Sequence, residues 1–120
     1  MAGITARSFD APDETRAPDK TLLEVVHLEA ATVARLTAQP GWRWSECVKP
    51  VAGTDSCQVR HLGLAVSGRI HVAHEDGTEC DIGPGQVYLI EPGHDAWVVG
   101  DEPLVAYEFE SAAAEKYGRS

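Results

Sequence analysis

The chain has 120 residues, 43% of them hydrophobic, and a formal net charge of −9 from 10 basic and 19 acidic side chains. This length suits one domain with one core. The acidic balance argues against binding to nucleic acid or to anionic membrane surfaces, because both need clustered Lys and Arg.

Targeting and redox features are sparse. No apolar run approaches the roughly 20 residues of a membrane span, and the polar N-terminus lacks the apolar core of a signal peptide. Cys47, Cys57 and Cys80 are too few for a disulfide framework. We therefore expect a cytoplasmic protein with free cysteines.

The first half of the chain predicts an arm followed by strands. Residues 1–20 are acidic and poor in large apolar side chains, so we expect an extended arm with Phe9 as its anchor. Residues 21–28 are a strand-like apolar run, and residues 31–38 alternate in part. Residues 42–48 alternate large apolar with polar side chains, which predicts a half-buried strand.

The second half consists of short apolar runs separated by turn residues. An Asp-Gly pair (Asp76, Gly77) predicts a tight hairpin, and residues 111–117 predict a short C-terminal helix. The expected strands are residues 56–66, 69–74, 79–82, 86–91, 95–99 and 104–109. Short strands at regular spacing predict an all-β barrel or sandwich, with the arm at 1–20 and one domain at 21–120.

Residues 85–97 carry the most informative pattern. They begin after a Gly-Pro-Gly corner, continue as an apolar run to a Pro92-Gly93 turn, and place His94 just beyond it. This resembles the second motif of the cupin superfamily, G-x(5)-P-x-G-x(2)-H. Gly68 resembles the glycine that closes the first motif, G-x(5)-H-x-H-x(3,4)-E-x(6)-G. The resemblance implies a double-stranded β-helix (a jelly-roll barrel), a metal in the barrel, and a homodimer that the N-terminal arm can cross.

The metal-ligand positions depart from those motifs. In register, the first-motif ligands fall on Asp55, Cys57 and His61, and the second-motif histidine falls on Ala96. Cys57 and His61 share a strand face, and His94 can reach the same space from the turn. Thiolate and imidazole suit Zn²⁺, Fe²⁺ or Cu, so we expect a divalent transition metal on Cys57, His61 and His94. Three protein ligands leave a position open for substrate.

Other residues complete the expected site. Glu46 is a candidate fourth ligand or general base, and His61 a candidate catalytic base beside a carboxylate such as Glu46 or Asp95. The expected substrate-binding residues are three aromatic rings and one guanidinium: Trp44, Tyr88, Trp97 and Arg69. Each also has a structural interpretation, as core volume, a hydrogen-bonded histidine or a solvated arginine.

Three functions remain open at this point. The first is a metal-dependent cupin enzyme acting on a small organic molecule. The second is a metal-free ligand-binding or sensor module, because the usual His/His/Glu/His set is missing. The third is a metal-free acid–base enzyme of the epimerase or cyclase type. A bound metal that chelators remove separates the first from the others.

Overall fold

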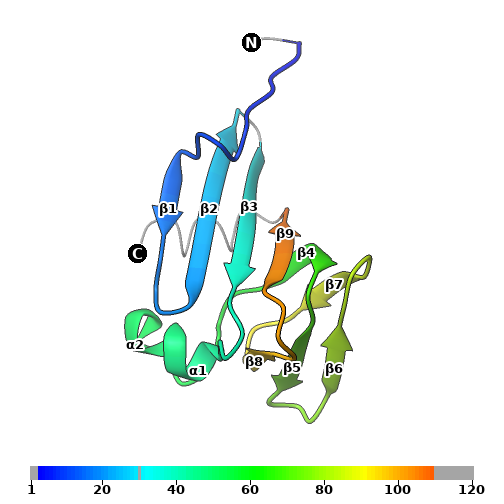
Figure 1. Cartoon of the computed structure of the whole chain (residues 1–120). Coiled ribbons are helices and arrows are strands. Elements are labelled where there is room, and N and C mark those ends of the chain that lie inside the picture. The colour runs from blue at the N-terminus through cyan, green and yellow to red at the C-terminus, as the bar shows by residue number, and fades with distance from the viewer. Residues whose placement is uncertain (1–2, 30, 110–120) are drawn as a thin grey trace.

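The computed structural model describes residues 3–29 and 31–109 of the chain (Figure 1). Its strands and helices are β1 (Glu14–Arg16), β2 (Thr21–Leu28), β3 (Ala31–Ala38), α1 (Trp44–Cys47), α2 (Lys49–Ala52), β4 (His61–Ser67), β5 (Ile70–His74), β6 (Glu79–Ile82), β7 (Val87–Ile90), β8 (His94–Val98) and β9 (Leu104–Glu108). Within this part of the chain, no helix is long and apolar enough to cross a membrane.

The strands form two antiparallel sheets. The larger has the order β1-β2-β3-β9-β4-β7, and the smaller has the order β6-β5-β8. The two helices lie beyond the end of β3, on the path toward β4 (Figure 1). The expected all-β architecture with a jelly-roll arrangement is therefore present.

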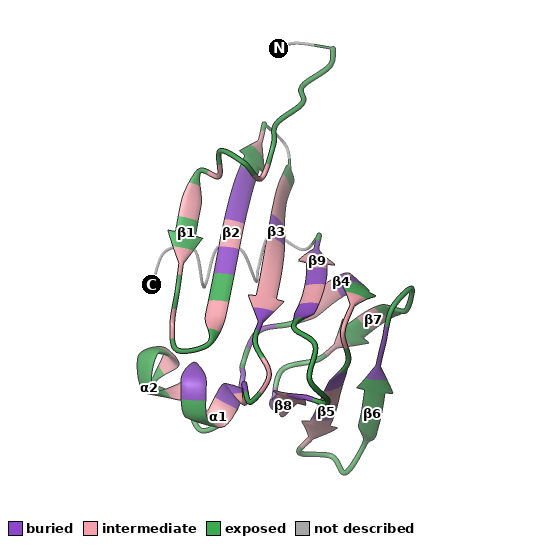
Figure 2. Ribbon diagram, in the orientation of Figure 1, coloured by how far each residue is buried: buried purple, intermediate pink, exposed green. Residues whose placement is uncertain are grey.

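The core lies between the sheets because alternate residues of each strand face inward. In β9, Leu104, Ala106 and Glu108 are buried, whereas the residues between them are half-buried (Figure 2). The main core cluster takes buried side chains from both sheets and from the helical segment: Ala38, Trp42, Trp44, Cys47, Val48, Cys57, Val59, Ala65, Ile70, Val72, Ile82, Ala96, Val98 and Leu104.

The turns predicted from glycine and proline are confirmed. Gly77 has φ 94° in the hairpin between β5 and β6, and Gly93 has φ 100° before β8. Gly68 has φ 77°, and a Cβ there would lie 2.3 Å from the Pro103 carbonyl oxygen. Only glycine fits such a left-handed, crowded position without strain.

The strand predicted at residues 42–48 is wrong. Apart from an isolated bridge between Arg43 and Trp97, this segment turns into α1, and α2 follows with a proline in its first turn. Trp44, Cys47 and Val48 are all buried at i, i+3 and i+4, which is the spacing of one helix face. The alternation of apolar and polar residues favoured a strand, whereas this spacing favoured a helix. Burial of the three side chains in the core decided in favour of the helix.

Two further expectations need adjustment. Residues 56–66 are not one strand, because β4 begins only at His61. The N-terminal arm is extended, but β1 within it pairs with β2, so the sheet begins inside the arm. Phe9 packs on Tyr107 with ring centroids 5.7 Å apart, as an anchor should. The predicted helix at residues 111–117 lies outside the described residues.

Candidate metal centre

The turn at Gly93 brings His94 back onto Cys57. The two residues form an isolated antiparallel bridge, in which the Cys57 amide donates to the His94 carbonyl at 2.8 Å. The Gly93 amide donates to the Cys57 carbonyl at 2.7 Å. Backbone hydrogen bonds therefore hold both Gly93 and His94 against Cys57. This pairing places the Cys57 thiol beside the His94 ring although Cys57 lies outside any regular strand.

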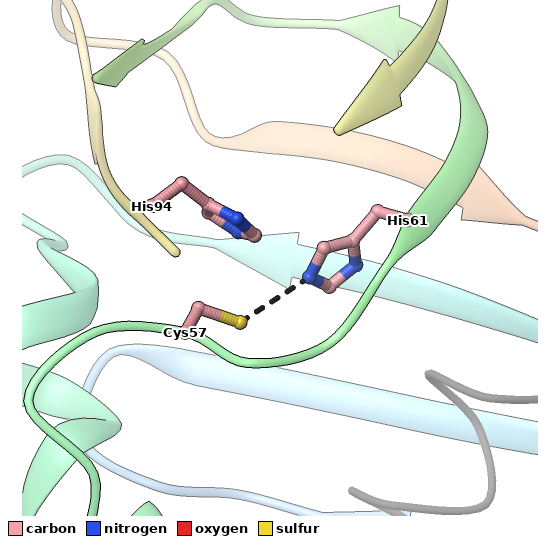
Figure 3. A group of neighbouring side chains, drawn as sticks. All are labelled: Cys57, His61 and His94. Carbon is pink, nitrogen blue, oxygen red and sulfur yellow. Dashed lines mark hydrogen bonds between the residues drawn. The ribbon is translucent and has the colours of Figure 1, made fainter. Parts of the chain in front are cut away.

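His61 completes a Cys/His cluster, which we define as Cys57, His61 and His94. One ligand atom from each residue lies within 4.8 Å of the others, and Figure 3 shows the three side chains pointing toward one another. Sγ of Cys57 is 3.4 Å from Nε2 of His61, and the two imidazole rings meet edge-on with centroids 5.1 Å apart. Cys57 and His94 are 1% and 4% exposed, so the cluster is shielded from bulk water.

Both imidazoles are oriented by oxygen acceptors on their Nδ1 atoms. Nδ1–H of His94 donates to the Glu91 carbonyl at 2.8 Å, and Nδ1–H of His61 donates to Oε1 of Glu108 at 2.6 Å. The hydroxyl of Tyr88 donates to the other Glu108 oxygen at 2.7 Å. Because these bonds occupy Nδ1 of each ring, Nε2 is the atom that faces a metal, which is the usual arrangement around ligating histidines.

The electrostatics of the cluster favour a thiolate. Burial opposes ionisation of Cys57, but hydrogen bonds from His61 and His94 outweigh it and lower the pKa of Cys57 to about 6. Burial likewise opposes protonation of His61, but the charge of Glu108 and the contact with Cys57 raise the pKa of His61 to about 10. Burial and the Glu108 carboxylate raise the pKa of Tyr88, which therefore stays a hydrogen-bond donor.

A cavity of about 220 Å³ adjoins the cluster. His61, His94 and Glu108 contribute to its wall, and most of the remaining wall is apolar. Trp44 lines it as well, and its buried Nε1 has no hydrogen-bond partner in the described part of the chain. A mostly apolar cavity with a few convergent polar groups is typical of a small-molecule site.

The structure brings some of the expected site residues to this cavity and not others. Trp44 and Tyr88 line it with the two histidines of the cluster. Trp97 instead contacts the His71 ring, with centroids 4.8 Å apart, and the Arg43 guanidinium, which lies 4.2 Å from the Trp97 ring centroid. It therefore lies outside the expected pocket wall.

Glu46 and Arg69 also lie away from the expected positions. Glu46 is exposed on α1, with its carboxylate 3.9 Å from Arg43, so the helix turns it away from the cluster. Arg69 is exposed and its guanidinium packs over Gly83. Asp95 accepts from the backbone and hydroxyl of Ser45, which ties α1 to β8.

Glu108 is the residue of the candidate site that the sequence did not predict. It supplies the carboxylate beside His61 that was expected from Glu46 or Asp95. A signal was present, because Glu108 follows Leu104 and Ala106 in alternation and so falls on the apolar face of its strand. An acidic side chain at such a position is rarely buried without a partner.

The donor set and spacing fit a transition metal. Zinc binds thiolate at about 2.3 Å and imidazole at about 2.0–2.1 Å, so a tetrahedral site places sulfur and nitrogen roughly 3.5 Å apart. The observed separation of 3.4 Å between Cys57 and His61 agrees with that value. One thiolate and two imidazoles suit Zn²⁺, Fe²⁺ or Cu²⁺ better than Mg²⁺ or Ca²⁺.

Comparison with known proteins gives structural likeness alone. No protein-family model matches the sequence, and no curated protein matches it. A protein of unknown function from Rhizobium leguminosarum is 18% identical, with a TM-score of 0.64 over 90% of this chain and 97% of its own. A cupin-like protein from Thermotoga maritima is 16% identical, with a TM-score of 0.52 over 75% of this chain and 67% of its own.

An enzyme shares the architecture as well. The oxalate decarboxylase of Lactobacillus farciminis is 16% identical, with a TM-score of 0.59 over 90% of this chain but only 33% of its own. Identities this low concern the fold and leave the reaction open. The sheet order, the turns at Gly68 and Gly93 and these likenesses together show that the chain has the fold of the cupin superfamily.

Proposed function

We propose that the protein binds one divalent transition metal through Cys57, His61 and His94 and acts on a small organic molecule in the adjoining cavity. The observation that carries this proposal is the convergence of three donor atoms within 4.8 Å, with both Nδ1 atoms occupied by oxygen acceptors. Zn²⁺, Fe²⁺ and Cu²⁺ are the ions that this donor set favours.

A bound metal of this kind supplies Lewis-acid or redox chemistry at its open coordination position. The residues of the chain prepare the site for it. Glu108 holds the ring of His61 in place, and Tyr88 holds Glu108 through its second oxygen. The mostly apolar wall of the cavity provides a low local dielectric, which strengthens the electrostatic interactions of a bound molecule with the histidines and Glu108.

Elemental analysis of tag-free protein, purified without chelator, tests the proposal. We expect about one metal ion per chain, lost in Cys57→Ser, His61→Gln and His94→Gln. Cys47→Ser is the matched control, because Cys47 is also a buried free cysteine but lies outside the cluster. Metal retained in all three cluster variants, or none in the wild type after reconstitution with Zn²⁺, Fe²⁺ and Cu²⁺, would reject the site.

A second candidate is a metal-free acid–base enzyme. The 2.6 Å bond between Glu108 and Nδ1 of His61 favours it, because a carboxylate that orients an imidazole is the usual support of a catalytic base. This candidate predicts that no stoichiometric metal is retained and that chelators leave the melting temperature unchanged. The same elemental analysis therefore decides between the two candidates.

The expected homodimer is also carried forward as a proposal. The outer face of β4 and β7 exposes apolar side chains, with Val66, Val87 and Leu89 at 42%, 72% and 53% exposure. Large exposed apolar patches usually mark interaction sites. Light scattering should give twice the chain mass for the wild type and less for Leu89→Lys, and a monomeric wild type would reject the dimer.

A further inference from the structure

We propose that molecules enter the cavity through a mouth between α2 and the turn that joins β1 to β2 (residues 17–20), and that Ala17 and Val51 on its two sides admit slim apolar molecules and exclude branched ones. The inference deepens the proposed function and rests on it for the role of the cavity as a substrate site. The Cys/His cluster by itself sets neither the route of entry nor the shape of the substrate.

Exposure along the cavity wall shows where the cavity reaches the surface. Beside the Cys/His cluster the wall is buried, because His94, Ala96 and Glu108 are each 5% exposed or less. Among the described residues that line the cavity, only Ala17 and Val51 are exposed, and the exposed fraction of Val51 is 59%. A residue that faces both the cavity and the solvent lies at an opening. These two residues therefore mark the mouth.

The two sides of the mouth come from segments that are far apart in the sequence. Ala17 follows β1 and Val51 lies in α2, yet both line the same cavity. In Figure 1 the turn between β1 and β2 lies beside the helical segment. The Cys47 thiol of α1 donates a hydrogen bond to the Asp19 carboxylate of that turn at 4.0 Å, so the two segments are in contact next to the mouth.

Hydrogen bonds hold the turn between β1 and β2 in place. The Thr21 amide donates to the Pro18 carbonyl at 3.0 Å, and the Gln39 amide donates to the Lys20 carbonyl at 2.9 Å. Nε1 of Trp42 donates to the Thr21 hydroxyl at 2.8 Å. This side of the mouth is therefore tied both to the end of β3 and to a buried side chain of the core.

The opposite side of the mouth is constrained as well. The Val51 amide donates to the Val48 carbonyl at 2.9 Å within the single turn of α2, and Gly53 ends this turn with φ 75°. A β-branched side chain in a helix has one strongly preferred rotamer, so the two methyl groups of Val51 form a rigid edge. Ala17, opposite, has no rotamers at all. A mouth between two such side chains selects molecules by their width.

The chemistry of the route defines the second property of the substrate. The side chains at the mouth and next to it are aliphatic, and the wall beyond them is mostly apolar: Ala17, Pro18, Val48 and Val51. Arg16 also lines the cavity, but it already has an interaction partner within the chain. The cavity volume of about 220 Å³ equals that of about seven water molecules in the liquid. A short, unbranched apolar molecule fits both the mouth and the cavity.

NMR titration of two isomeric alcohols tests the inference. Unbranched hexyl alcohol and neohexyl alcohol, which carries a tert-butyl group, have the same formula and no charge, and they differ chiefly in width. Line-shape analysis gives the association rate constant, the dissociation rate constant and the dissociation constant of each probe. We expect the wild type to bind hexyl alcohol about tenfold faster than neohexyl alcohol. The chemical-shift changes should include Ala96 and Ala106, which are buried residues of the cavity wall.

Substitutions at the mouth should change rates rather than affinity. A higher barrier to entry slows association and dissociation by the same factor and leaves the dissociation constant unchanged. We expect Val51→Phe and Ala17→Phe each to slow both steps about tenfold for hexyl alcohol, and Val51→Ala to give the two alcohols equal association rates. Val99→Phe and Val99→Ala are the matched controls, because Val99 is also an exposed valine but does not line the cavity. Both should bind like the wild type.

Four outcomes would overturn the inference. They are equal association rates of the two alcohols in the wild type, wild-type rates in folded Val51→Phe and Ala17→Phe, shift changes that do not include Ala96 and Ala106, and no binding of either alcohol. Circular dichroism confirms that each variant is folded. Val51→Ala, which only removes two methyl groups at an exposed position, gives an independent test in case the larger side chains prevent folding.

Metal content, measured on the same samples, separates this inference from the proposed function. Zinc-loaded and chelator-treated protein are both titrated, because an alcohol can also coordinate a metal. Selection by width that depends on Val51, in protein that retains no metal even after reconstitution, would uphold the mouth and reject the metal chemistry. Bound metal with association rates independent of Val51 would do the reverse.

Discussion

Replacement of Glu108 by glutamine tests how the buried carboxylate prepares His61 for a metal. Glu108 is 5% exposed, and each of its oxygens accepts one hydrogen bond, from His61 at 2.6 Å and from Tyr88 at 2.7 Å. Glutamine keeps the shape but offers one oxygen and one NH₂ group. Either His61 keeps a neutral acceptor, or its Nδ1–H meets a second donor and the tautomer must change.

The expected loss follows from two separate magnitudes. A hydrogen bond to a charged group contributes about 1.5–3 kcal/mol and a neutral one about 0.5–1.5 kcal/mol, so removing the charge costs His61 about 1 kcal/mol or more. Substitution of residues that orient metal ligands weakens metal affinity by about 10–100-fold, or about 1.4–2.8 kcal/mol. Both ranges include a free-energy cost that corresponds to about a tenfold weakening of metal affinity. Tenfold is therefore the smallest loss of zinc affinity that we expect for Glu108→Gln.

The assay is a competitive zinc titration against a chromophoric chelator at neutral pH. Tyr88→Phe is the control, because it removes one hydrogen bond from Glu108 and leaves the charge beside His61, so its loss should be smaller. The reasoning is refuted if folded Glu108→Gln binds zinc as tightly as the wild type, or if Tyr88→Phe loses as much as Glu108→Gln.

Three further outcomes are expected. A Cβ at Gly63 would lie 2.6 Å from the Tyr88 hydroxyl. Gly63→Ala should therefore lower the free energy of unfolding by about 1–3 kcal/mol in urea titrations and weaken zinc binding. Wild-type values for both quantities would contradict this packing. Hydrogen bonds that the His71 ring donates to Glu79 and Asp81 raise the pKa of His71 above its ordinary value. Their stabilising effect is therefore complete below about pH 6.5 and is lost as the pH rises through the raised pKa. His71→Gln should therefore lower the urea midpoint more at acidic than at alkaline pH, whereas an equal effect at both would count against these bonds. Chelator treatment should lower the melting temperature of the wild type, and added Zn²⁺ should restore it in a concentration-dependent manner; no shift would indicate that the folded chain binds no metal.

The turns of the fold were predictable because their chemistry is local. Gly77 and Gly93 have positive φ at the positions where Asp-Gly and Pro-Gly pairs indicated tight turns. The strands between these turns were predictable because each apolar run is too short for a helix of ordinary length. The inward face of His61 was also predictable, since Gly63 and Ala65 on that face are buried as alternation requires.

The segment at 42–48 was not predictable from alternation alone. Trp42, Trp44, Cys47 and Val48 fit a strand in part and a helix in part, and a window this short carries both periods. Burial against the rest of the core decided in favour of α1. Glu46 was misplaced for the same reason, because a helix turns it outward where a strand was expected.

The cluster was partly predictable and its surroundings were not. Cys57 and His61 were found through motif spacing and His94 through its place after the Pro-Gly turn, although only the bridge between Cys57 and His94 explains why they meet. The pairing of β1 with β2 carried no signal, since nothing local indicates that an acidic, proline-containing arm adds a strand to the sheet. Long-range pairing of this kind depends on side-chain packing more than on intrinsic preference.

The bridge between Cys57 and His94 has a mechanical consequence. His61 begins a strand of the larger sheet, His94 begins a strand of the smaller sheet, and Cys57 lies on the connection that reaches β4. An ion bound by all three residues would therefore cross-link the two sheets at one corner. The sheets could then separate only after the ion is released. Amide hydrogens on β4 and β8, far apart in the chain, should then exchange as one cooperative unit when the ion is present and as two independent units when it is removed.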